Sequence, residues 1–263
     1  MSFFSVHQLT AGYGGQPILE NISFQADAGC ITGILGGNGS GKTTLLKAIC
    51  GIVPHEGSCV LESTPLEQLS PRPQARLCSY IPQRSGISID ISALDVVLMG
   101  FNPHLGLLES PSAAMKKAAE AALEQVGLSG KAQENYLHLS EGQKQLCILA
   151  RTLVSGSRLL LLDEPESALD FRFRYRMLAL LQTWVKQEQR AALVTLHDPM
   201  LALNCCDKLI LLADGCVCGT LLPRTDSLEK MARMLEEIYG SIELQRCCTP
   251  SGRTHLVMLK EDA

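Results

Sequence analysis

The feature that most constrains this chain is a glycine-rich stretch at residues 36–44, which reads GGNGSGKTT. It matches the pattern G-x-x-x-x-G-K-[ST], in which backbone N–H groups cradle phosphate oxygens. An apolar run at residues 31–35 precedes it and a helix-prone run at residues 43–52 follows it. This is the strand–loop–helix context that the pattern requires, so the stretch predicts a nucleotide-phosphate site rather than a glycine-rich turn that binds nothing.

Each residue type in this stretch suits that chemistry. Glycine leaves the backbone N–H groups unobstructed and adopts positive φ at little cost. Lys42 is expected to reach the β- and γ-phosphates as a point charge, and the hydroxyl of Thr43 is placed to bind Mg²⁺. The N-terminus of the following helix adds partial positive charge. The candidate phosphate-binding residues are Gly36, Gly37, Asn38, Gly39, Ser40, Gly41, Lys42, Thr43 and Thr44.

Composition and charge limit the class of protein. The 263 residues are 46% hydrophobic and 19% charged, which is typical of a globular chain with a large core. The formal net charge of −4 argues against a general nucleic-acid binder. No apolar run approaches the ~20 residues that span a bilayer, and the N-terminal residues lack the basic flank and apolar stretch of a signal peptide. We therefore expect a cytosolic location.

The chain has eleven cysteines, a high and odd number. None of the closely spaced cysteines has the C-x₂₋₄-C spacing, paired with a second such element, that zinc sites use. We therefore expect reduced, structural thiols that act as small hydrophobes, with adventitious metal binding or oxidation at the paired cysteines as the alternative. The closely spaced cysteines are Cys205 and Cys206, Cys216 and Cys218, and Cys247 and Cys248.

The hydrophobic pattern predicts an α/β fold. Residues 3–35 alternate short strands with turns, and residues 4–9 are expected to form an edge strand. From about residue 92 to residue 152 the spacing becomes helical, which indicates an inserted α-helical lobe. Continuous apolar strands return at residues 159–162 and 191–196, as in a parallel sheet buried on both faces. Further expected elements are helices at 93–99, 112–126, 171–187 and 228–239, a hairpin at 209–221, and late strands at 242–247 and 255–259.

Two carboxylates, Asp163 and Glu164, end the apolar strand at residues 159–162. Such a strand can carry Asp163 to a metal ion and Glu164 to the water beside the γ-phosphate, where a carboxylate can polarise the attacking water. Their position about 120 residues after the phosphate loop favours this role over two acids that cap a loop.

The run Leu139-Ser140-Glu141-Gly142-Gln143 precedes a helix-prone stretch at residues 144–153. Here the chain resembles the ATP-binding cassette (ABC) family, whose signature is L-S-G-G-Q. Glu141 stands where the family most often has glycine, whereas Ser140, Gly142 and Gln143 are retained. The resemblance implies that these three retained residues bind nucleotide, with Ser140 and Gly142 meeting the γ-phosphate.

Four further elements resemble the family at matching places. Residues 167–170, Ser-Ala-Leu-Asp, resemble the D-loop, and His197 resembles the switch histidine that contacts the γ-phosphate. Gln83 resembles the Q-loop glutamine that senses Mg²⁺ and water, and Tyr13 resembles the aromatic residue that stacks on adenine. The resemblance thus implies a catalytic set of Glu164, His197 and Gln83, and a metal-binding set of Thr43, Gln83 and Asp163.

The resemblance runs from about residue 3 to residue 220 and implies a single ABC ATPase domain over residues 1–263. This domain is a P-loop NTPase core with an N-terminal antiparallel β subdomain and an inserted α-helical subdomain. We expect residues 1–83 and 156–263 to form the RecA-like and β core, and residues 84–155 to form the α-helical subdomain with the signature. In this family two subunits sandwich two ATP molecules, so we expect a homodimer that uses ATP and Mg²⁺.

The inserted lobe indicates what is transported. Residues 94–106, LDVVLMGFNPHLG, resemble the ATPases of iron-siderophore, haem and cobalamin importers, which carry D-V-V-x-x-G-R-x-P-H near this point. Phe101 stands where a basic residue is usual. The resemblance implies an importer ATPase whose helical subdomain docks on separate integral membrane permease subunits at the cytoplasmic face. A substrate-binding protein would be an indirect partner, and no nucleic-acid partner is expected.

Two alternatives belong to other classes. One is a soluble, non-transport ABC ATPase, for example of the iron–sulfur assembly scaffold type. The other is the ATPase of another ABC importer or of an exporter. Co-purification with a many-helix permease favours transport, whereas isolation as a soluble complex favours the scaffold.

Overall fold

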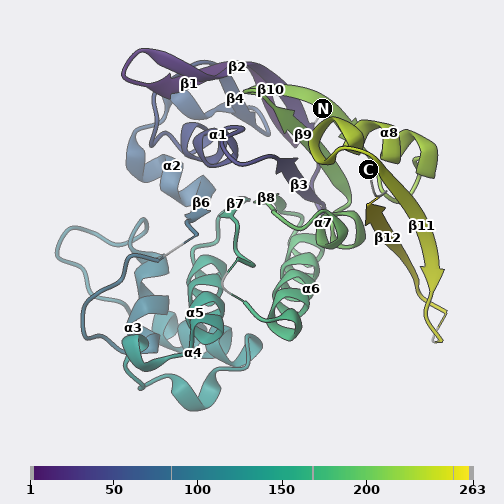
Figure 1. Cartoon of the computed structure of the whole chain (residues 1–263). Helices are drawn as coiled ribbons and strands as arrows, with labels where there is room; N and C mark the ends of the chain where they lie inside the picture. Colours follow the sequence, from purple (N-terminus) through teal and green to yellow (C-terminus); the bar gives the residue numbers. More distant parts are fainter. Residues whose placement is uncertain (1–2, 84, 168, 251, 261–263) are drawn as a thin grey trace.

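The protein is described from a computed structural model that covers residues 3–83, 85–167, 169–250 and 252–260 (Figure 1). Ala168 of the predicted D-loop lies outside the described residues, as do the two ends of the predicted 1–263 domain. No helix in the part of the chain that the structure describes is both long enough and apolar enough to cross a membrane.

The helices and strands follow one another in a mixed order. The strands are β1 (Phe4–Tyr13), β2 (Gln16–Ala26), β3 (Ile31–Gly36), β4 (His55–Leu61), β5 (Thr64–Pro65), β6 (Cys78–Ile81), β7 (Leu159–Asp163), β8 (Ala191–Thr195), β9 (Lys208–Ala213), β10 (Cys216–Leu221), β11 (Ile242–Cys248) and β12 (Thr254–Lys260). The α-helices are α1 (Lys42–Ile49), α2 (Pro71–Leu77), α3 (Ala93–Leu98), α4 (Ala113–Gln125), α5 (Glu141–Val154), α6 (Phe171–Gln187), α7 (Pro199–Cys205) and α8 (Leu228–Tyr239). The 3₁₀ turns are η1 (Leu66–Gln68), η2 (Met99–Phe101), η3 (Ser129–Lys131) and η4 (Tyr136–His138).

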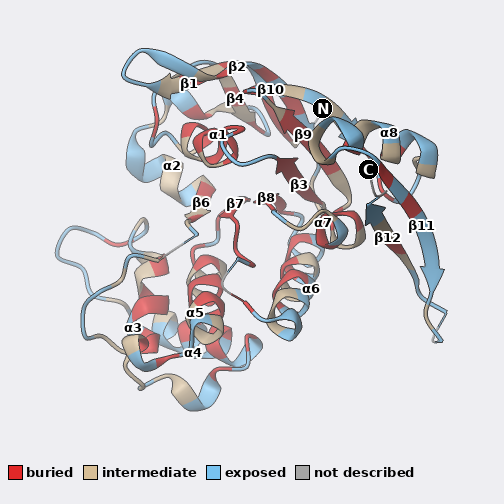
Figure 2. Ribbon diagram, in the orientation of Figure 1, coloured by how far each residue is buried: buried red, intermediate tan, exposed pale blue. Residues whose placement is uncertain are grey.

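A six-stranded sheet in the order β10-β9-β3-β8-β7-β6 forms the centre of the molecule. The strands from β9 to β6 pair in parallel, and β10 joins β9 as an antiparallel hairpin. Asp214 and Gly215 connect this hairpin with φ values of 46° and 73°, as a tight turn between twisted strands requires. Every residue of β3, β7 and β8 is buried, which agrees with the continuous apolar runs in the sequence (Figure 2).

A second, antiparallel sheet has the order β2-β1-β4-β5 and lies on the α1 side of the central sheet (Figure 1). The prediction of an edge strand at residues 4–9 is wrong, because β1 lies between β2 and β4 and pairs with both. The local pattern could not reveal this, since the second partner β4 comes more than forty residues later in the chain. The strand also extends beyond residue 9 and ends at Tyr13.

The helical lobe consists mainly of α3, α4 and α5, below the central sheet in Figure 1. A serine begins each helix as its N-cap: Ser92 before α3, Ser112 before α4 and Ser140 before α5. Each hydroxyl accepts a hydrogen bond from a backbone N–H of the first turn, which satisfies a donor that the helix itself leaves free. The predicted inserted lobe is therefore present.

The buried side chains form two hydrophobic clusters on opposite faces of the central sheet. Leu160 and Leu162 of β7 pack with the helical lobe and with the C-terminal elements α8, β11 and β12. Leu159 and Leu161 of the same strand pack with α1 and the antiparallel sheet. This alternation follows from the two-residue period of a strand.

Candidate nucleotide site

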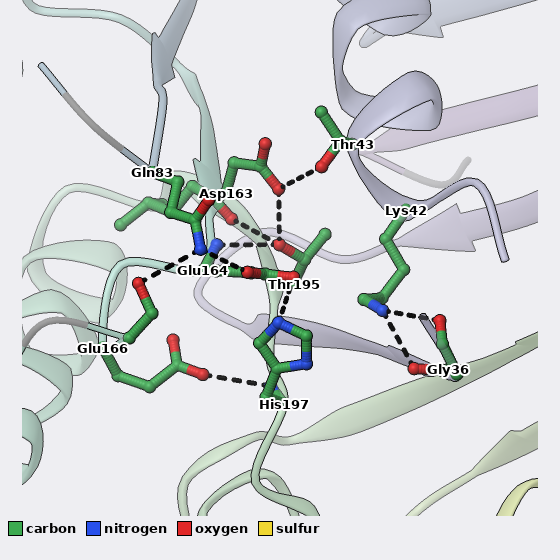
Figure 3. Close-up of polar contacts among 12 residues, drawn as sticks. Gly36, Lys42, Thr43, Gln83, Asp163, Glu164, Glu166, Thr195 and His197 are labelled. Atoms are coloured by element: carbon green, nitrogen blue, oxygen red, sulfur yellow. Dashed lines mark hydrogen bonds and ion pairs between the residues drawn. The ribbon is translucent and has the colours of Figure 1, made fainter. Parts of the chain in front are cut away.

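The glycine-rich loop between β3 and α1 encloses the ammonium group of Lys42. Lys42 Nζ donates to the carbonyl oxygen of Gly36 at 2.9 Å and to that of Gly37 at 3.0 Å, and only 5% of the residue is exposed (Figure 3). Gly41 has a φ of 97°, a conformation that few other residues adopt. Burial lowers the pKa of Lys42, while the nearby carboxylates act in the opposite direction. The charge of Lys42 is thus held within the loop.

Three hydroxyl groups surround the carboxylate of Asp163 at the end of β7. Thr43 Oγ1 donates to Asp163 Oδ1 at 3.0 Å, and Thr195 Oγ1 lies 2.9 Å from the same oxygen. Tyr80 Oη donates to Asp163 Oδ2 at 3.1 Å. The Thr43 hydroxyl, in the first turn of α1, and the Asp163 carboxylate offer oxygen ligands of the kind that Mg²⁺ prefers. These two residues therefore fit the predicted Mg²⁺.

Three other side chains, those of His197, Gln83 and Thr195, converge on Glu164 (Figure 3). Its Oε1 lies 2.6 Å from His197 Nε2, and its Oε2 accepts a hydrogen bond from Gln83 Nε2 at 2.7 Å. Its backbone N–H donates to Thr195 Oγ1 at 2.8 Å, and its φ is 46°. A positive φ at a glutamate is uncommon and costs energy, so the surrounding hydrogen bonds hold this side chain in a defined place.

A pocket of about 390 Å³ brings most of these residues together. Its lining combines residues of the phosphate loop with Gln83, Glu164 and His197. Its lining includes Ile18, Asn38, Gly39, Ser40, Gly41, Lys42, Thr43, Thr44, Gln83, Glu164 and His197. The sequence therefore predicted residues that the fold places around one cavity.

Six predicted nucleotide-binding residues lie outside this lining. Two of them, Gly36 and Gly37, belong to the phosphate loop, and their carbonyl oxygens accept the hydrogen bonds of Lys42. Ser140, Gly142 and Gln143 are at the N-terminus of α5, on the helical lobe, where Ser140 and Gln143 form a reciprocal capping box. Glu141, which departs from the family signature, pairs with Lys144 at 2.8 Å. Tyr13 is half exposed at the end of β1.

Three polar residues of the site were not predicted, and two of them, Thr195 and Glu166, are buried. Thr195 bridges Asp163 and the backbone of Glu164, and the signal was a hydroxyl at the end of an otherwise apolar strand. Tyr80 contacts Asp163. Glu166 is 2% exposed, and its Oε1 accepts a hydrogen bond from the backbone N–H of His197 at 3.0 Å. Burial raises the pKa of the Glu166 carboxyl.

We expect Thr195→Val to lower the rate of ATP hydrolysis by about tenfold. The variant removes the hydroxyl that holds both Asp163 and the backbone of Glu164, and it leaves a buried N–H unpaired at a cost of about 1–3 kcal/mol. Steady-state kinetics and urea unfolding measure the two effects, and Thr195→Ser should restore both. The control is Thr32→Val, since the buried Thr32 hydroxyl has no hydrogen-bond partner among the described residues. Wild-type hydrolysis by Thr195→Val would contradict the role of this bridge.

A phosphate loop, a strand-end Asp–Glu pair and a strand-end histidine on a parallel sheet define a phosphate-loop ATPase. Comparison with known proteins narrows this class. The family model described as "ABC transporter" matches residues 19–167. The chain therefore belongs to the ABC transporter family, and it is an ATP-binding ATPase. The predicted fold class and the predicted enzyme class are confirmed.

Individual relatives agree with this assignment. The chain is 38% identical to the hemin import ATP-binding protein HmuV of Bordetella pertussis, over 79% of its own length and 81% of the relative's. It is 37% identical to a probable iron chelatin transport ATP-binding protein of Helicobacter pylori, over 80% and 83% of the two lengths. Among solved structures, a metal-chelate type ABC transporter in an inward-facing conformation has a TM-score of 0.84, 26% identity and 99% coverage of both chains.

Proposed function

We propose that this chain hydrolyses ATP to drive the import of a metal chelate, of the iron-siderophore, haem or cobalamin kind, through separate permease subunits. The observation that Lys42, Glu164 and His197 line one pocket supports the proposed ATP hydrolysis. The cargo class rests on the similarity to hemin and iron-chelatin transport proteins and to a metal-chelate transporter. A non-transport ATPase and a different cargo are the alternatives.

The geometry suits in-line attack of water on the γ-phosphate. The loop N–H groups and Lys42 bind the phosphates and neutralise their charge. Glu164 accepts a proton from the attacking water, whose oxygen bonds to the γ-phosphorus as the bond to the ADP oxygen breaks. His197 and Gln83, which contact the Glu164 carboxylate, orient this base and the water. Thr43 and Asp163 would hold Mg²⁺, which supplies positive charge to the phosphate oxygens.

A second copy of the chain would complete the site. ATPase subunits of this family work as dimers with membrane permease partners. The signature residues Ser140, Gly142 and Gln143 lie on the helical lobe, away from the lining of the phosphate pocket of their own chain. We infer that they meet the nucleotide bound by the partner copy, so that the homodimer sandwiches two ATP molecules.

The helical lobe offers an apolar surface for the permease. Leu107 and Leu108, in the loop between η2 and α4, are each 97% exposed. Two adjacent leucines that are almost fully exposed form a continuous apolar surface, and such surfaces are typical of interaction sites. Docking there would hold the subunit at the cytoplasmic face of the membrane.

The proposed function is tested by uptake in the cells that encode the chain. We expect a strain that carries Glu164→Gln to lose ATP-dependent uptake of one labelled metal chelate among a ferric siderophore, haem and cobalamin. The same strain should keep uptake of a labelled amino acid, which serves as the control. Unchanged uptake of all three chelates, together with recovery of the chain in a soluble complex, would support the non-transport alternative.

A further inference from the structure

Three side chains with metal-ligating atoms converge in the antiparallel sheet, apart from the nucleotide pocket. They are His55 and Cys59 on β4 and Glu67 on η1, and their ligand atoms all lie within 4.8 Å of one another. His55 Nε2 lies 3.2 Å from Glu67 Oε1 and 4.0 Å from Cys59 Sγ. The same Glu67 oxygen accepts a hydrogen bond from the backbone N–H of Cys59. The catalytic scheme above uses none of these groups.

A bend in β4 brings His55 and Cys59 together. Residues four apart in an extended strand are separated by about 13 Å, too far for their side chains to meet in this way. The pairing of β4 with β1 is shifted between Ser58 and Glu56, and Gly57 has a φ of 85° at this bulge. A Cβ atom at Gly57 would lie 2.4 Å from the carbonyl oxygen of Gln8, so glycine is required there. Bulges bend a strand and redirect its side chains, which explains the position of the His55 ring.

The distances suit a small tetrahedral ion. With zinc bonds of about 2.05 Å to nitrogen, 2.1 Å to oxygen and 2.3 Å to sulfur, tetrahedral ligands are separated by about 3.4 Å for N···O and about 3.6 Å for S···N. The observed separations of 3.2 Å and 4.0 Å require shifts of only a few tenths of an ångström. The third pair, Cys59 Sγ and the Glu67 oxygen, lies within 4.8 Å, so it must close toward the tetrahedral value of about 3.6 Å when the ion binds. A thiolate, an imidazole and one carboxylate together favour zinc-like ions over Mg²⁺ or Ca²⁺, which prefer oxygen ligands alone.

An ion can reach this position from solvent. Cys59 is fully buried, but the side chains of His55 and Glu67 are 8% and 27% exposed. A groove of about 420 Å³ runs past His55 along the β1–β2 hairpin and is lined by Thr10, Ala11, Gly12, Gly15, Gln16, Pro17, Pro54, His55 and Glu56. His55 is the ligand that this groove reaches, so water in the groove is the source of the fourth ligand.

We propose that His55 Nε2, Cys59 Sγ and a Glu67 carboxylate oxygen bind one divalent transition-metal ion of the zinc type, with water as the fourth ligand. As the metal–sulfur bond forms, the thiol proton of Cys59 passes to solvent. The bound ion links β4 to η1 and thereby stabilises the antiparallel sheet that carries Tyr13. This site is independent of the nucleotide and of the transported cargo.

Cobalt(II) serves as the probe, because a thiolate ligand gives it a charge-transfer absorption band. We titrate reduced, metal-free, full-length protein in which the exposed Cys247 and Cys248 are replaced by serine. The expected result is one tightly bound equivalent with a thiolate band. Glu67→Gln, which keeps a hydrogen-bond acceptor for the Cys59 N–H, should weaken binding by at least about tenfold, and Cys59→Ser should remove the band. The control is Cys78→Ser, which makes the same change at another buried cysteine of the same hydrophobic cluster and should keep the band.

A second measurement uses Zn²⁺ alone and does not depend on a cysteine variant. At about 100 times the dissociation constant, Zn²⁺ should raise the thermal midpoint of the protein by about 5 °C or more, and Glu67→Gln should remove most of this shift. The proposal is overturned if Glu67→Gln and His55→Gln bind cobalt as tightly as the parent protein. It is equally overturned if the band requires Cys78, or if no equivalent of cobalt binds.

Discussion

Replacing Glu164 with glutamine is expected to lower the rate of ATP hydrolysis by about 10²–10⁴-fold while ATP still binds. A positioned general base contributes a factor of this size. Glutamine has nearly the same shape and can keep a hydrogen bond to Gln83, but its amide cannot accept the proton of the attacking water. Phosphate release under saturating MgATP measures the loss. Size-exclusion chromatography with MgATP should then show a persistent dimer, because the closed state forms but does not turn over.

The matched control is Glu236→Gln, which removes one exposed carboxylate on α8. It should hydrolyse ATP at the wild-type rate. A Glu164→Gln protein that remains monomeric with MgATP and still turns ATP over at the wild-type rate would contradict both the role of Glu164 and the proposed dimer.

Lys42→Ala is expected to weaken ATP binding by about 10²–10³-fold. Lys42 is a buried cation whose two hydrogen-bond partners, Gly36 and Gly37, belong to the phosphate loop itself. Its loss removes hydrogen bonds from a charged group, each of which contributes about 1.5–3 kcal/mol, and leaves the triphosphate without a nearby positive side chain. Equilibrium binding of a fluorescent ATP analogue, measured without turnover, gives the change in affinity.

Lys47→Ala is the control, because it removes the same charge from the same helix at a partly buried position. The affinity of the Lys47→Ala variant for the ATP analogue should stay within about twofold of wild type, since Lys47 does not line the pocket of 390 Å³. Equal losses in the two variants would show that overall charge, rather than the position of Lys42, determines nucleotide affinity.

The sequence predicted most of the fold, because most elements carry a clear local signal. The helices α6 and α8 have the predicted bounds, and the hairpin β9–β10 matches the predicted range to within one residue. The helix α7 was missed, although Asp198 caps it and Pro199 occupies its first position. It has only seven residues, which is too short for a periodic pattern to be distinct.

The candidate site was predictable to the extent that its residues end strands or begin helices. Lys42 begins α1 and Asp163 ends β7, and Glu164 and His197 follow the ends of β7 and β8 within two residues, where motifs are visible in one sequence. Thr195 was not predicted, because its role depends on the parallel register that sets it beside Asp163. The cluster at His55 was also missed, since the bulge at Gly57 and the fold of η1 onto β4 cannot be inferred from spacing alone.

The alternating faces of β7 have a mechanical consequence. Leu160 and Leu162 pack with the helical lobe, whereas Leu159 and Leu161 pack with α1 and the antiparallel sheet. The same strand ends at Asp163, next to Glu164. Protein interiors are close-packed and transmit strain. A displacement of the helical lobe is therefore expected to reach Asp163 at the end of β7, because this strand packs against both layers.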